Sequence, residues 1–138
     1  MPERLKKASF QPFLSDDGRI KIPLTIDDSV EYLLFDTGSS LFTLTASKEN
    51  ALKTADPKIE DSLTVMSWGK QLTFYGVRTK KAVKFGNKVL SGSLVYYDEQ
   101  RTFEDFYRFA KIWGLTGNAF FLKNTVIIDY KHRLFGVL

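Results

Sequence analysis

Residues 32–40 read Tyr32-Leu33-Leu34-Phe35-Asp36-Thr37-Gly38-Ser39-Ser40 and place a single acid between an apolar run and a tight turn. Tyr32 to Phe35 are four consecutive large apolar residues, a pattern typical of a strand buried on both faces. Gly38 lets the backbone turn sharply after this strand. The hydroxyl groups that follow Asp36 can hydrogen-bond its carboxylate and stabilise the ionised form. The stretch therefore predicts a preorganised carboxylate.

The order Asp36-Thr37-Gly38 resembles the Asp-Thr-Gly signature of the aspartic peptidases. In that family two such turns meet, and their carboxylates share a proton across an activated water. Taken alone, the tripeptide also fits an ordinary turn in which Asp36 bonds its own backbone. Two further segments favour the catalytic interpretation. The first is Ile20 to Ile26, which with the turn Asp27-Asp28-Ser29 predicts a hairpin leading into the Asp36 strand, as in peptidase lobes.

The second segment lies near the other end of the chain. Residues 114–122, followed by Val126-Ile127-Ile128-Asp129-Tyr130, resemble the apolar-apolar-glycine element, short helix and closing strand of a retropepsin-like lobe. One departure is Leu115-Thr116 before Gly117, because the family usually has a large aliphatic pair there. The resemblance covers roughly residues 19–138, and it is weakest between Ser47 and Asp61.

The length of 138 residues is that of one ordinary domain, and the chain contains one Asp-Thr-Gly and no internal repeat. A peptidase built from this chain would therefore be a homodimer. We divide the chain into an N-terminal segment, residues 1–18, and a retropepsin-like lobe, residues 19–138. Asp129 lacks a following glycine turn, and we interpret it as structural.

The resemblance implies a mostly β fold: a closed, barrel-like single lobe with one main α-helix. Thr102 to Trp113 has helical spacing, and we expect Thr102 to be its N-cap and Gly114 to end it. One face of this helix is aromatic, which we interpret as core: Phe103, Phe106, Phe109 or Ala110, and Trp113. A shorter helix is expected around Lys48 to Lys53.

Both ends of the chain carry large apolar residues, Phe10 and Phe13 near the start and residues 134–138 at the end. The terminal segment is therefore expected to dock rather than fray. In retropepsin-like dimers the termini contribute strands to the subunit interface, so residues 1–18 are a candidate interface strand. Packing within one subunit is an equally good interpretation.

Residues 62–67 and 71–75 flank Trp68-Gly69-Lys70 and predict a β-hairpin with a glycine near its tip. Its position matches the peptidase flap, a hairpin that closes over substrate. Trp68 at the tip would supply a large apolar surface for an extended peptide. The alternative is that Trp68 folds back onto its own sheet.

Composition excludes several kinds of site. The chain has no cysteine and one histidine, His132, in a polar turn, which argues against thiol chemistry, a Ser-His-acid triad and a histidine-rich metal site. We therefore expect no metal and no cofactor.

The net charge is +4, with a basic cluster between Arg78 and Lys88 that we interpret as an exposed strand edge rather than a nucleic-acid site.

No run approaches the ~18 apolar residues of a membrane helix, and the N-terminus lacks the apolar segment of a signal peptide. We therefore expect a soluble domain, exported if an N-terminal signal has been removed from the sequence. The sequence does not determine the cellular compartment, because the absence of cysteine is compatible with either side of the membrane.

The function implied is that of an aspartic endopeptidase, acting on a peptide or protein substrate through Asp36 from each of two subunits. The resemblance gives each neighbour a role: Thr37 bonds across the dyad, Gly38 brings its backbone to the carboxylate, and Ser39 bonds the outer carboxylate oxygen. Trp68, Gly69 and Lys70 would cover the substrate. The competing function is that of a catalytically inactive peptide-binding or dimerisation module with the same fold. A regulatory domain cut from a longer membrane-anchored chain is a third.

Overall fold

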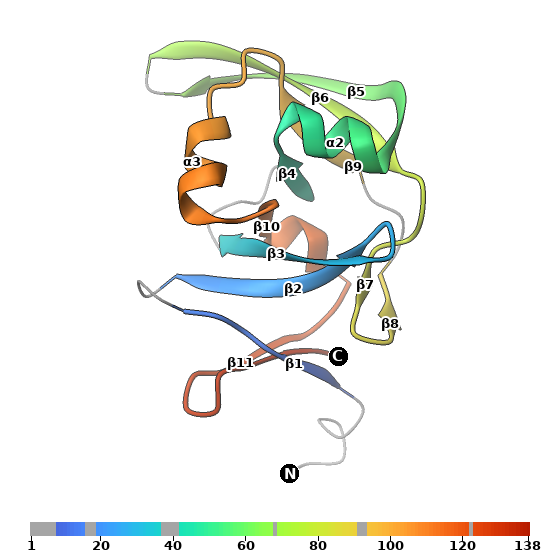
Figure 1. Cartoon of the computed structure of the whole chain (residues 1–138), viewed down its shortest axis with the longest axis vertical. Helices are drawn as coiled ribbons and strands as arrows, with labels where there is room; N and C mark the ends of the chain where they lie inside the picture. Colours follow the sequence, from blue (N-terminus) through green and yellow to red (C-terminus); the bar gives the residue numbers. More distant parts are fainter. Residues whose placement is uncertain (1–7, 16–18, 37–41, 68, 91–93, 122) are drawn as a thin grey trace.

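The computed structural model describes residues 8–15, 19–36, 42–67, 69–90, 94–121 and 123–138 (Figure 1). The fold is mostly β, as the sequence predicts. In chain order its elements are β1 (Ser9–Pro12), β2 (Ile20–Ile26), β3 (Ser29–Asp36), β4 (Leu44–Ala46), α2 (Lys48–Thr54), β5 (Ala55–Ser67), β6 (Lys70–Thr79), β7 (Lys84–Phe85), β8 (Lys88–Val89), β9 (Leu94–Asp98), α3 (Glu104–Ala110), β10 (Gly114–Gly117), a 3-10 helix η1 (Asn118–Phe121), β11 (Val126–Asp129) and β12 (Leu134–Val137).

The strands form two sheets. The larger has the order β5-β6-β9-β4-β10-β3-β2-β7-β8, and the smaller has the order β1-β12-β11. Strand β10 runs parallel to β3 and antiparallel to β4, while β4 runs parallel to β9. In the described residues β5 and β8 stand at the two ends of the larger sheet, so its closure into a barrel stays a prediction.

The predicted hairpin is formed by β2 and β3. Asp27 and Asp28 at its tip both have positive φ, 50° and 65°, which is the two-residue turn whose twist matches that of the flanking strands. The apolar residues Ile22, Leu24 and Leu33 on these strands are fully buried. In Figure 1 the smaller sheet lies on one side of β2, and both helices lie on the other side, between β3 and the β5–β6 hairpin.

Helix α3 confirms the predicted helix but not its ends. Its N-cap is Phe103, whose side chain has no acceptor and makes no cap bond, and the N–H of the preceding Thr102 donates to Asp98 Oδ2 at 2.8 Å. Gly114 does not end the helix, since Lys111 already leaves it in the left-handed conformation with φ of 55°. The expected capping roles of Thr102 and Gly114 were wrong, because Phe103 holds the N-cap position and the N–H of Lys111 closes the last turn onto the carbonyls of Tyr107 and Arg108.

The aromatic stripe of α3 is only partly core. Phe103 and Phe106 are half-buried, and Tyr107 is the buried aromatic residue of the helix. Ala110, not Phe109, is the stripe's third member, because Phe109 is 89% exposed. Burial raises the pKa of Tyr107, so its hydroxyl stays neutral across the physiological range.

The terminal strands dock, as predicted. Strand β12 pairs with β1 on one side and β11 on the other, and Phe135 and Val137 are fully buried. The partner of β1 thus lies in the same chain, in agreement with packing within one subunit. A role for residues 1–18 at a subunit interface, and the division at residue 19, stay predictions.

Candidate active site

Asp36 is the last residue of β3 and is exposed, while Leu33, Leu34 and Phe35 before it are buried. The parallel pairing of β10 sets Leu115, Thr116 and Gly117 beside Leu34, Phe35 and Asp36, in that order. Gly117 is therefore the cross-strand neighbour of Asp36. The strand carries the acid out of the core to an edge where it meets solvent.

Thr116, the polar departure from the apolar pair, is almost completely buried. Its hydroxyl lies 3.5 Å from the carbonyl oxygen of Thr43, to which it donates a long hydrogen bond. A buried hydroxyl needs such a partner. The threonine therefore fits between β3 and β4 without leaving an unpaired polar group, and the element keeps its place beside Asp36.

A pocket of about 740 Å³ opens beside Asp36. Its walls come from β2, β3, α3, β10, β11 and the residues next to them: Arg19, Ile20, Leu34, Phe35, Asp36, Phe103, Phe106, Leu115, Ile128 and Tyr130. Most of these side chains are apolar, and the size is typical of a small-ligand or side-chain pocket. The arrangement places one carboxylate at the wall of an apolar pocket.

Helix α3 is held against this pocket by packing and by one cap. Tyr107 and Ile112 pack with Leu34 of β3, and Lys21 Nζ donates to the carbonyl oxygen of Ala110 at 2.9 Å. A cation at the C-terminal end of a helix is favourable for its dipole. The helix is thus fixed with Phe106 facing the pocket.

Two residues at the rim complete the pocket. The guanidinium carbon of Arg19 lies 5.8 Å from the ring centroid of Phe106, within cation–π range. Tyr130 follows β11, is 66% exposed, and makes an edge-to-face contact with Phe13 at 6.0 Å.

Asp129, which precedes Tyr130, stabilises the turn after β11, since its carboxylate accepts from the backbone N–H of His132 at 3.1 Å and lies 2.8 Å from His132 Nδ1. This position agrees with a structural role for Asp129.

The β5–β6 hairpin confirms the predicted hairpin. Ser67 pairs with Lys70, and Gly69 at the tip has φ of 74°, which favours glycine. Midway along β5, Tyr96 Oη donates to Asp61 Oδ2 at 2.6 Å, and burial together with this bond raises the pKa of Tyr96 to about 12. The closing of this hairpin over a substrate stays a prediction, as do the roles of Gly69 and Lys70.

Thr37, Gly38, Ser39 and Trp68 lie outside the described residues, so their predicted roles are untested. Sequence reasoning missed Arg19, Phe103, Phe106 and Tyr130 as pocket residues. The helical spacing of Phe103 and Phe106 was visible, but it fits a core and a pocket wall equally well. Nothing local to Arg19 or Tyr130 signals that they approach Asp36.

Among the described residues, no group of three or more His, Asp or Glu side chains could hold a metal ion. In the same part of the chain, neither helix has the length and apolar character needed to cross a membrane.

No protein-family model and no curated protein sequence matches this chain. Among solved structures it is similar to a retropepsin-like aspartic protease from Rickettsia conorii, with a TM-score of 0.59. The two share 16% sequence identity, and the match covers 95% of this chain and 91% of the other. At that identity the likeness concerns the fold alone. The chain therefore has a retropepsin-like fold.

Proposed function

We propose that this chain is an aspartic endopeptidase that works as a homodimer, with Asp36 from each copy forming a catalytic dyad. The observation that carries the proposal is the position of Asp36, exposed at the end of a buried strand, beside Gly117 and at the wall of an apolar pocket. A strand end rigidly held by the core is a suitable support for a reacting group. The similar fold of a known aspartic protease supports the same assignment.

The chemistry follows from placing two carboxylates together. At ~3 Å and an effective dielectric of ~20, two charged carboxylates would repel by roughly 5 kcal/mol, so the pair would keep one proton between them. The ionised Asp36 takes a proton from a bound water as the water oxygen attacks the peptide carbonyl carbon. The protonated Asp36 of the second copy donates its proton to the carbonyl oxygen. In the collapse of the resulting diol the C–N bond breaks, the Asp36 that holds the water proton gives it to the leaving nitrogen, and a diol hydroxyl returns a proton to the other Asp36.

The pocket beside Asp36 would receive one side chain of an extended peptide. Leu34, Leu115 and Phe106 present apolar surface there, so a large apolar side chain would gain most from entering. Its burial next to the carboxylate would also exclude water from the reacting bond.

The competing candidate is an inactive peptide-binding module of the same fold. It is favoured by the pairing of β1 with β12 inside one chain, which gives both terminal strands a partner without a second copy, although β1 stays at the edge of its sheet. In that case the apolar pocket would still bind peptide, but no second Asp36 would approach the first.

Sedimentation and cleavage of an unfolded protein test the proposal together. We expect a dimer, cleavage with a maximum on the acidic side of neutral, and inhibition by a statine-type transition-state mimic. A stable monomer without cleavage, at protein concentrations up to about 100 μM, would favour the inactive module. Activity that rises steadily through pH 8 would contradict a carboxylate dyad.

A further inference from the structure

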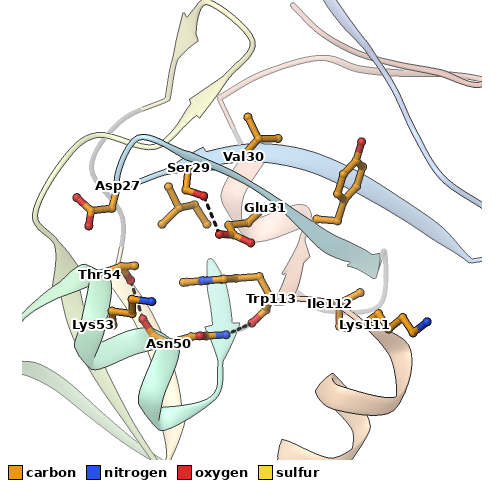
Figure 2. Close-up of a pocket in the computed structure, with 12 residues that line it drawn as sticks. Asp27, Ser29, Val30, Glu31, Asn50, Lys53, Thr54, Lys111, Ile112 and Trp113 are labelled. Carbon is orange, nitrogen blue, oxygen red and sulfur yellow. Dashed lines mark hydrogen bonds between the residues drawn. The ribbon is translucent and has the colours of Figure 1, made fainter.

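A second pocket, of about 470 Å³, lies at the opposite end of β3 from Asp36 (Figure 2). Ser29 is the first residue of this eight-residue strand and Asp36 is the last, so the two ends are roughly 23 Å apart. The walls of this second pocket come from the β2–β3 turn, helix α2 and residues 111–113. No role for it follows from peptide hydrolysis at Asp36.

Trp113 forms the floor of the second pocket. The residue is only 8% exposed, and its backbone is fixed on both sides: its N–H donates to the carbonyl of Tyr32 at 2.8 Å, and its carbonyl accepts from Asn50 Nδ2 at 3.1 Å. In Figure 2 the indole lies between Glu31 and Asn50. Within the described residues, no acceptor pairs with its N–H, so a largely buried tryptophan offers an unused donor to the pocket.

Charged groups of both signs line the same pocket. Glu31 is half-buried, and its Oε1 accepts from Ser29 Oγ at 3.0 Å, which leaves its second oxygen open to another donor. Asp27 lies at the turn with its carboxylate directed away from Glu31, and Lys53 reaches in from α2, whereas Lys111 extends away from the group (Figure 2). Among the described residues none of these four side chains takes part in an ion pair.

The two kinds of group come from different elements. The carboxylates of Asp27 and Glu31 belong to the β2–β3 hairpin, while the donors Lys53 and Asn50 belong to α2, and the indole of Trp113 lies between Glu31 and Asn50. A ligand of a single charge would meet its complement on one side and repulsion on the other. A ligand with an ammonium at one end and a carboxylate at the other would meet both complements.

We propose that this pocket binds a small zwitterion, a free amino acid or a dipeptide. The ammonium lies toward Glu31, and the carboxylate accepts hydrogen bonds from Lys53 and from the indole N–H of Trp113. Such charge-assisted hydrogen bonds are the strong ones in a partly enclosed site. The inference stands independently of the proposed peptidase activity, because it uses no residue of the Asp36 pocket.

Two-dimensional ¹H–¹⁵N spectra of the full chain test the site, since the indole N–H of Trp113 gives its own signal. The chain has two tryptophans, and Trp68→Phe assigns the signal of Trp113. We expect L-alanyl-L-alanine to shift this signal with a Kd of about 1 mM or tighter. N-acetyl-L-alanyl-L-alanine lacks the ammonium and L-alanyl-L-alaninamide lacks the carboxylate, and each should bind about tenfold more weakly.

Paired variants assign the two ends of the ligand. Glu31→Gln should remove the preference for a free N-terminus but keep that for a free carboxylate, and Lys53→Gln should do the reverse. Glu49→Gln on the exposed face of α2, and Asp36→Asn at the other pocket, should bind the dipeptide as the unmodified chain does. An unshifted Trp113 signal at about 10 mM dipeptide, or equal binding of the blocked dipeptides, would overturn the proposal even if a variant failed to fold.

Discussion

The two ends of β3 carry pockets of opposite character. At the Asp36 end, α3, β10 and β11 bring aromatic and aliphatic side chains around one carboxylate. At the Ser29 end, the β2–β3 turn and α2 bring carboxylates, a lysine and an amide around one buried indole. The same strand supplies Leu34 and Phe35 to the first pocket and Glu31 and Tyr32 to the second.

This difference shows that β3 positions both pockets but does not determine which ligands they can bind. The middle of β3 is buried in the core, and only its ends reach solvent. What each end can bind depends on the helix that packs next to it: α3 and its N-cap contribute Phe106 and Phe103, and α2 contributes Asn50 and Lys53. Substitutions in one pocket should therefore leave binding or catalysis at the other pocket unchanged.

Asp36→Asn should give the largest effect. The change keeps the volume of the side chain but removes the proton acceptor, so peptide hydrolysis should fall by about 10⁴-fold. The melting temperature should change little, because Asp36 is exposed. Cleavage assays and thermal melts on the same preparation check this, and equal turnover by the variant would contradict the role of Asp36.

Gly114→Ala should damage both pockets at once. An added Cβ would overlap with the carbonyl oxygen of Thr45, a backbone atom that cannot rotate away, so β10 must move from β4. We expect a loss of about 3 kcal/mol in the free energy of unfolding, measured by urea denaturation. Gly69→Ala is the control, because a Cβ added there would meet no atom within 4 Å. The φ of 74° at Gly69 is unfavourable for alanine, so the free energy of unfolding should fall by only about 1 kcal/mol. Similar losses of unfolding free energy for the two variants would show that β10 can move away from β4 without a large loss of stability.

Phe106→Ala and Phe109→Ala separate the pocket face of α3 from its solvent face. Phe106 lines the pocket and packs against the core, while Phe109 on the same helix is 89% exposed. For substrates with a large apolar residue at the cleaved bond, Phe106→Ala should lower kcat/KM by about tenfold, and Phe109→Ala by less than about twofold. Phe106→Leu should recover most of the loss. Equal losses for both alanine variants would contradict the assignment of the pocket.

Asp129→Asn should have the smallest effect, at the turn that carries Tyr130. The side-chain and backbone hydrogen bonds from His132 hold the pKa of Asp129 below its ordinary value of 3.8. A lowered folded-state pKa stabilises the fold above the ordinary value, and this contribution is lost as the pH falls through the lowered one. The variant should melt no more than about 2 °C lower at pH 7, and this gap should close below about pH 4. A gap that is independent of pH would contradict the assignment, and Asp105→Asn on the exposed face of α3 serves as the control.

The sequence by itself determined the features that depend on neighbouring residues. The apolar run from Tyr32 to Phe35 predicted a buried strand that ends at Asp36, and turn residues predicted the β2–β3 and β5–β6 hairpins. Helical spacing predicted α3, and a short helix expected around Lys48 to Lys53 matches α2. These patterns act within a few positions, where steric limits and the period of exposure leave few alternatives.

Only the tertiary structure decided which distant segments meet. The parallel pairing of β10 with β3, the approach of Phe106 and Tyr130 to Asp36, and the meeting of Trp113 with Glu31 join residues far apart in the chain. An aromatic stripe is equally apolar whether it faces the core or lines a pocket, so its period does not reveal which. The free energy that settles this comes from packing among all the elements together, and no local segment contains that information.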